Sequence, residues 1–188
     1  QRMYEKAREN FQNALEIQLD TLGKMHPEIV SRYNNIGFVS FRAGDYEKAV
    51  ENYQNALEIR LAIADENDLD IALNYYNIGL SHKLQGAYEA ALKSYGNALA
   101  HRKAALGERH PKVASIYNSI GAIYSEQSDY EKALHLHKKA LAIQLDSLEE
   151  THSDVLITYN DIGLVYWYQG IYEKALENFQ KVLDIRLV

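Results

Sequence analysis

Apolar residues recur along this chain at helical spacing, within stretches that are separated by short polar segments. The first clear apolar face consists of residues at i, i+3, i+4 and i+7: Tyr33, Ile36, Gly37 and Ser40. A second stretch with the same spacing follows after a Gly-Asp pair. The pattern predicts two amphipathic helices, at approximately 28–43 and 46–64, joined by a tight turn.

This pair of helices is one unit of an internal repeat with a constant step of 42 residues. Three series keep the step without slippage: Tyr4, Tyr46, Tyr88, Tyr130 and Tyr172; Tyr33, Tyr75, Tyr117 and Tyr159; and Gly37, Gly79, Gly121 and Gly163. Positions 42 residues apart are said below to share a register. Chance does not hold three registers over four periods, so the sequence predicts helix hairpins that stack on one another.

Residues that favour helix ends occupy the breaks between the stretches. Helices are expected to end at Gly44, Gly86 and Gly170, and Ser128 stands at the same register in the third repeat. The expected N-cap residues are Asp45 and Asp129. His26, His110 and His152 lie in equivalent return connections, where we expect them to cap helices rather than to bind a metal; Asp68 is the alternative cap in one repeat. A helix-interior glycine costs about 0.5–1 kcal/mol relative to alanine, so the Gly37 register predicts a close helix contact opposite residues such as Ala49.

The order of small and aromatic residues within the unit resembles the tetratricopeptide repeat. It is carried by Gly37, Tyr46, Ala49, Tyr53 and Ala56 and by their counterparts in the other periods. The usual unit has about 34 residues. The longer unit found here, with "LGKMHP" and "LGERHP", is similar to the kinesin light chain type. The resemblance implies an all-α, right-handed α-solenoid of stacked antiparallel helix hairpins that serves as a protein-protein interaction scaffold.

The repeat phase divides the chain into one orphan second helix and four hairpins. The expected segments of this single array are 1–24, 25–66, 67–108, 109–150 and 151–188. Since the chain opens and closes on a second helix, we expect a fragment of a longer array, or a designed or excised chain. Apolar residues at the two ends, such as Phe11 and Val182, offer an alternative function as a module that self-assembles head to tail. A further alternative is regulation of an NTPase or protease domain.

Composition, charge and absent motifs argue against several other classes of function. The net charge is −6 with interspersed signs, which argues against binding to nucleic acid or to an anionic membrane. There is no cysteine and no apolar run of the roughly 18–20 residues that span a bilayer, and we expect a cytoplasmic protein. No phosphate-binding glycine motif and no HExxH motif is present, so we expect no enzyme, cofactor or metal. His82 is expected to be a hydrogen-bonded core residue, and His135 and His137 to point in different directions.

In tetratricopeptide superhelices one face of each first helix lines a concave groove, and the resemblance places twelve residues there. They are Asn34, Phe38, Phe41, Arg42, Tyr76, Leu80, Lys83, Asn118, Asn160, Leu164, Trp167 and Tyr168. Packing registers account for every tyrosine except Tyr76 and Tyr168, which together with Trp167 become candidate anchors for a protein or peptide ligand. Arg42 and Lys83 lie toward one end of this face and favour an acidic end of the ligand there.

One groove register carries asparagine in three of the four hairpins: Asn34, Asn118 and Asn160, with Tyr76 in the gap. In kinesin light chain-like repeats an asparagine at this register hydrogen-bonds the backbone of an extended peptide. The resemblance therefore implies three rungs of a peptide ladder, since an amide matches a peptide unit. The alternative is a set of solvated surface asparagines. In either case the pattern assigns Asn34 no role in the scaffold.

Overall fold

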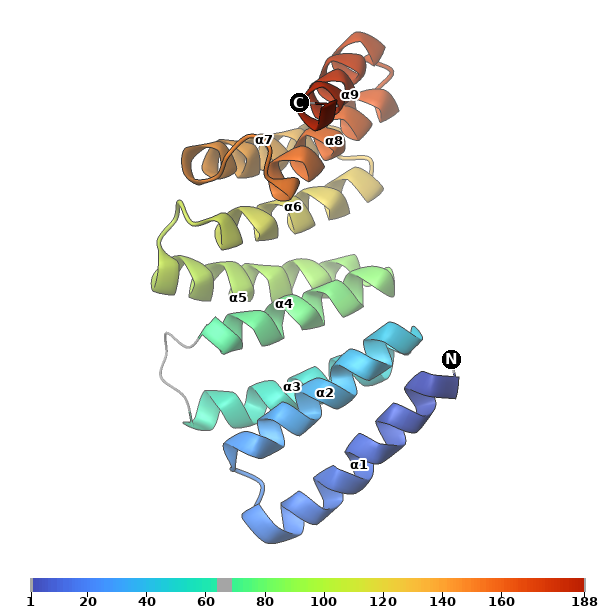
Figure 1. The fold of residues 1–188 in the computed structure, drawn as a ribbon, viewed down its shortest axis with the longest axis vertical. Helices are drawn as coiled ribbons and strands as arrows, with labels where there is room; N and C mark the ends of the chain where they lie inside the picture. Colours follow the sequence, from blue (N-terminus) through green and yellow to red (C-terminus); the bar gives the residue numbers. More distant parts are fainter. Residues whose placement is uncertain (1, 64–68, 188) are drawn as a thin grey trace. The chain divides into compact units, whose positions relative to one another are not determined.

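A computed structural model describes residues 2–63 and 69–187, which within these ranges form nine α-helices and no strand (Figure 1). The helices are α1 (Arg2–Leu22), α2 (Pro27–Ala43), α3 (Tyr46–Ile63), α4 (Leu69–Leu84), α5 (Tyr88–Leu106), α6 (Pro111–Glu126), α7 (Tyr130–Ser147), α8 (Ser153–Tyr168) and α9 (Tyr172–Leu187). The all-α class and the two-helix unit predicted from the periodicity are confirmed. The expected cap Asp68 lies outside the described residues.

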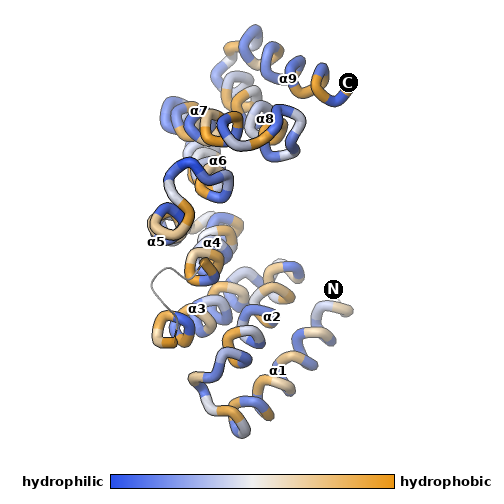
Figure 2. The backbone as a smooth tube through the Cα atoms, turned by 60° about the vertical axis from the view of Figure 1, so that its left-hand side comes forward, coloured by the Kyte–Doolittle hydropathy of each residue, from blue (hydrophilic) through white to orange (hydrophobic). Residues whose placement is uncertain are grey.

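The chain divides into two compact units, residues 1–101 and residues 102–188. Within the first unit, α1 packs on α2, α2 on α3 and α3 on α4. Within the second, α6 packs on α7, α7 on α8 and α8 on α9. Figure 2 shows that hydrophilic and hydrophobic residues alternate along these helices, so each presents an apolar stripe to its neighbours. Each unit is therefore built from sequential helices that turn back on one another (Figure 1).

The tight turns within the hairpins need a left-handed backbone conformation at one residue. Gly44 has φ 83°, and its N–H and that of the next residue bond to carbonyls of the last turn of α2. This is the αL ending that glycine adopts without steric cost. At the same register in the third repeat, Ser128 has φ 62° and is the one non-glycine residue with positive φ in the described part of the chain. The turn geometry is thus retained although the glycine is lost.

The return connections end in histidine caps, as the sequence predicts. His26, His110 and His152 each precede a first helix, and each Nδ1 accepts a hydrogen bond from the backbone N–H two residues later, at 3.1–3.2 Å. The role of His152 as a cap in the repeat that lacks proline is confirmed. These contacts satisfy amide groups that a helix N-terminus otherwise leaves without a partner.

The glycines inside the first helices lie against rings of the second helices. A Cβ at Gly37 would stand 2.8 Å from the Tyr53 ring, and a Cβ at Gly121 would stand 2.9 Å from the His137 ring. Tyr95 and Phe179 occupy the same place opposite the other two glycines. The predicted close contact is confirmed, but its partner is wrong: the ring at the Tyr53 register, rather than Ala49, lies nearest. A ring needs more room than a methyl group, which explains why glycine stands opposite it.

Candidate functional site

A surface pocket of about 360 Å³ opens in the first unit between α2 and α4, with α3 beneath it. Two of the predicted groove residues, Asn34 and Phe38, belong to its lining. The others, which sequence reasoning did not select, are Ser31, Asn35, Tyr53, Arg60, Asp70, Leu73, Asn74 and Asn77. The pocket therefore combines several side-chain amides with exposed apolar groups, which is the usual make-up of a site that orients a ligand by a few polar contacts.

Asn74 forms the polar floor of this pocket. It is buried, and its Nδ2 donates to Asn34 Oδ1 at 2.7 Å and to the main-chain oxygen of Tyr53 at 3.3 Å. Beside it, Arg60 and Asp70 form an ion pair at 2.8 Å. The expectation that Asn34 has no role in the scaffold is therefore wrong, because its oxygen joins α2 to α4.

The apolar side of the pocket is exposed to solvent. Phe38 is 53% exposed and Leu73 is 46% exposed. The Arg42 guanidinium lies 5.8 Å from the centre of the Phe38 ring, which is within the range of a cation–π contact. Large apolar side chains that stay exposed beside buried polar groups are available for contact with a ligand.

The other predicted groove residues of the first unit are more enclosed. Phe41 packs on Tyr46 with ring centres 5.6 Å apart, and Tyr76 packs on Tyr95 at 5.5 Å. Leu80 and Lys83 are half-buried. The interpretation of Tyr76 as a tyrosine without a packing role is therefore wrong, since its ring lies against the ring that faces the glycine register.

In the second unit the corresponding asparagine is part of a buried polar network. Asn118 Oδ1 lies 3.0 Å from His137 Nδ1, and Asn118 Nδ2 donates to Thr158 Oγ1 at 2.5 Å. Thr158 in turn donates to Gln144 Oε1 at 2.7 Å or to the main-chain oxygen of Asp154 at 2.9 Å. Thr158 and Gln144 are both buried. Asn118 thus ties α6 to α7 and α8 instead of standing free at the surface.

Burial determines the protonation of two of the rings that face the glycines. Burial lowers the pKa of His137 from 6.5 to about 4, so the imidazole is neutral at physiological pH. Burial raises the pKa of Tyr53 to about 12. For Tyr117, burial raises the pKa, but hydrogen bonds from Lys139 and Lys103 outweigh it and leave the pKa below its ordinary value.

Aromatic side chains gather at the end of α8 in the second unit. Trp167 is 55% exposed and packs edge-on against Tyr172, with ring centres 5.1 Å apart. Tyr168 is 59% exposed and stacks on Tyr130 at 6.3 Å. Tyr168 therefore has a packing partner that the sequence analysis did not assign, but most of its surface stays available. Asn160 and Leu164, on the same helix, are also exposed.

The remaining histidines do not form a site. His82 is half-buried, so the prediction that it is a core residue is wrong. The predicted hydrogen bond is present, because its Nδ1 lies 3.1 Å from Gln85 Oε1. His135 is exposed and His137 is buried, as predicted for residues two apart on a helix. Among the described residues, no cluster of three or more histidine, aspartate or glutamate side chains is arranged to hold a metal ion.

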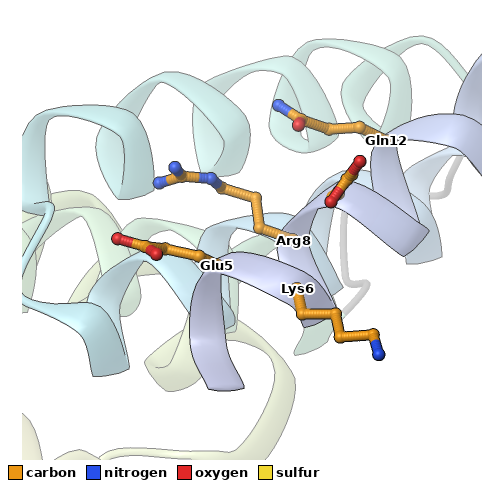
Figure 3. Close-up of a pocket in the computed structure, with 5 residues that line it drawn as sticks. Glu5, Lys6, Arg8 and Gln12 are labelled. Atoms are coloured by element: carbon orange, nitrogen blue, oxygen red, sulfur yellow. The ribbon is translucent and has the colours of Figure 1, made fainter. Parts of the chain in front are cut away.

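A second pocket, of about 510 Å³, runs along α1 (Figure 3). It is lined by charged and polar side chains of this helix alone: Glu5, Lys6, Arg8, Glu9 and Gln12. Arg8 is paired with Asp45 at 3.2 Å, and Lys6 points away from the other labelled side chains in Figure 3. With mixed charges and no apolar residue in its lining, this pocket is the weaker candidate. None of the helices that the structure describes has the length and hydropathy of a membrane span.

Comparison with known proteins gives matches in a family model and in solved structures. The model of the tetratricopeptide repeat matches residues 1–62, 31–100, 70–146 and 130–187. No curated protein matches. The crystal structure of BtubC (BKLC) from P. vanneervenii is 28% identical, with a TM-score of 0.85 over 98% of this chain and 73% of that chain.

Two further solved structures are similar at the level of the fold. A putative kinesin light chain from Podosopora anserina with nearly identical TPR-like repeats is 18% identical, with a TM-score of 0.82 over 97% of this chain and 87% of that one. The apo form of RapI is 23% identical, with a TM-score of 0.78 over 97% of this chain and 51% of that one.

Proposed function

Because the chain belongs to the tetratricopeptide repeat family, we propose that it is a protein-interaction scaffold that binds a peptide or helical segment of a partner protein. The helical repeats and their kinesin light chain-like neighbours support the scaffold role in general. The proposed binding surface is the first-helix face that carries the twelve predicted groove residues. On this proposal the protein acts by binding rather than by catalysis.

The observation that carries the proposal is the pocket between α2 and α4. Its amides can pair with both the N–H and the C=O groups of a peptide. Phe38 and Leu73 supply exposed apolar contacts beside them. A peptide segment has the same mixture of a polar main chain and apolar side chains. The ion pair between Arg60 and Asp70 leaves the pocket without a net charge from these two groups, which supports an uncharged stretch of the ligand at this point.

In the second unit, the exposed aromatic residues at the end of α8 support the same role. Tryptophan and tyrosine are enriched among residues that dominate binding energy, because their large rings lose little conformational freedom when a partner covers them. Trp167 and Tyr168 are more than half exposed, with Leu164 on the same helix. We therefore assign them as the anchors of the second unit.

The test is selection of peptides on the immobilised protein from a random display library, followed by measured affinities. Phe38→Ala and Trp167→Ala are expected to weaken a selected peptide at least about tenfold, or roughly 1.4 kcal/mol. Leu145→Ala is the matched control, because Leu145 is 43% exposed on α7 and lies outside the proposed surface. Failure to select any peptide, or equal losses in all three variants, would contradict the proposal.

One observation favours self-association as a second candidate function. On α9, Leu176 is 66% exposed and Leu183 is 50% exposed, whereas Val50 and Leu57 at the same registers are 8% exposed, in a cluster with residues of α4. An apolar helix face of this kind can bury itself against another copy. Light scattering against protein concentration tests this, with Leu176→Gln/Leu183→Gln expected to abolish any growth in mass. A concentration-independent mass in the wild type rules out this candidate.

A further inference from the structure

The hydrogen bonds beneath the first-unit pocket fix the orientation of Asn34. A main-chain carbonyl oxygen can only accept a hydrogen bond. Since the Asn74 amide group lies 3.3 Å from the main-chain oxygen of Tyr53, the atom facing that oxygen must be the Asn74 nitrogen. The same nitrogen lies 2.7 Å from the side chain of Asn34. The group that Asn34 turns toward Asn74 is therefore its oxygen.

The nitrogen of Asn34 is thus not the group that bonds to Asn74, and Asn34 is a lining residue of the pocket. The Asn34 oxygen is engaged between α2 and α4, while its two N–H groups carry no hydrogen bond to any residue that the structure describes. Asn34 lines the pocket beside the exposed ring of Phe38. A partly buried amide N–H gains most from a ligand that supplies an acceptor, and a peptide main chain supplies one at every carbonyl.

We propose that Asn74 is a positioning residue that holds the Asn34 amide nitrogen toward the pocket, so that this site accepts a main-chain carbonyl of the bound segment. The inference rests on the proposed function, and it states that the protein donates and the ligand accepts the hydrogen bond at Asn34. The three asparagines of the groove register are therefore not equivalent rungs. Asn34 presents donors, Asn118 is held at both ends by His137 and Thr158, and Asn160 is exposed.

Replacement of the amide by its isosteric acid tests the polarity of the contact. Asn34→Asp keeps an oxygen for the Asn74 N–H but replaces the donors of the pocket with a second acceptor. A peptide selected on the wild type is expected to bind this variant at least about tenfold more weakly. Asn13→Asp is the control, since it places the same charge on an exposed residue of α1 outside the pocket; it is expected to change the affinity by less than about threefold. Equal losses in the two variants overturn the proposal.

A second measurement needs no ligand and separates this inference from the proposed function. The carboxyl group introduced by Asn34→Asp accepts the Asn74 N–H, so its pKa is expected to lie below that of the carboxyl introduced by Asn160→Asp, when both are followed by carbon NMR. Adding Asn74→Ile, which copies Ile116 at the same register, is expected to abolish the difference. Equal pKa values without that addition overturn the role of Asn74. If no peptide is selected, the proposed function fails while this result still decides the orientation.

Discussion

The two units place a ring opposite a helix glycine and an asparagine beside it, but they complete this arrangement with different chemistry. In the first unit the ring is Tyr53, and Asn34 bonds to Asn74 on the next first helix. In the second unit the ring is His137, and it bonds to Asn118 directly. Asn34 is bonded through its oxygen, whereas Asn118 is bonded through both its oxygen and its nitrogen.

The difference shows that asparagines at one register can bond to different partners in different repeats. Where the ring is Tyr53, the Asn34 oxygen accepts a hydrogen bond from Asn74 on the next first helix, and the Asn34 nitrogen takes no part in that bond. A histidine ring bonds to the asparagine oxygen directly and adds a titratable group that is 1% exposed. The first unit therefore carries the site that we propose for the ligand, and the second is the unit whose stability should respond to pH.

The largest expected effect is the loss of stability of the second unit in acid. Burial holds the pKa of His137 at about 4, below its ordinary 6.5, so folding favours the neutral ring. Its contribution is complete above about pH 6.5 and is lost as the pH falls from 6.5 toward 4. At pH 4.5 the loss amounts to about 2–3 kcal/mol.

Urea unfolding at pH 7 and pH 4.5 measures this effect. His137→Phe serves as the comparison, because Phe179 occupies the same register opposite Gly163. The wild type is expected to lose about 2–3 kcal/mol more than the variant between the two pH values. An identical loss in both proteins would show that His137 does not titrate with folding.

Removal of the register asparagine should affect two repeats of the second unit unequally. Asn118→Ala removes the partner of buried His137 Nδ1 and the group that donates to buried Thr158, at a cost of about 2 kcal/mol. Asn160→Ala, at the same register but exposed, is expected to change the free energy of unfolding by less than about 0.5 kcal/mol. Chemical denaturation of the two variants checks the difference, and similar costs would contradict a stabilising role for the hydrogen bonds of Asn118.

Glycine substitutions test whether the ring contact is equally tight in both units. Gly37→Ala and Gly121→Ala push a methyl group into the Tyr53 and His137 rings, and each is expected to cost about 1 kcal/mol after the gain in helix propensity. Gly96→Ala is the control, because nothing lies within 4 Å of a Cβ placed there in α5. It is expected to raise the free energy of unfolding by about 0.5–1 kcal/mol, so the control and the test differ in sign.

The sequence predicted the parts of this architecture that depend on periodicity and on local chemistry. The 42-residue step located the hairpins, and the residues at the breaks identified the caps, including His152 without its proline. These features are local, because a helix end is determined by the few residues around it. The assignment of the twelve residues to one binding groove stays a prediction.

The polar contacts between neighbouring repeats could not be read in the same way. Asn74 and Thr158 share a register that also holds Arg32 and Ile116, so the register has no uniform character to mark it as buried. The bond from Asn74 to Asn34 joins residues 40 apart, two short of the repeat step, and becomes visible only when α2 and α4 lie side by side. One polar residue at an otherwise aromatic register, His137, was the available signal.

The smallest expected effect concerns the histidine caps, which should not distinguish the two units at all. His26 and His110 accept the same backbone N–H at 3.2 and 3.1 Å, and both precede a proline at the first helical position. His26→Ala and His110→Ala are each expected to cost about 0.5–1 kcal/mol, and the matching asparagine variants to recover most of it, since asparagine is a strong N-cap. Denaturation of the four variants at pH 7 measures these costs. Equal values would locate the difference between the units in the buried polar contacts of Asn34 and Asn118, whereas unequal values would show that it extends to the loops.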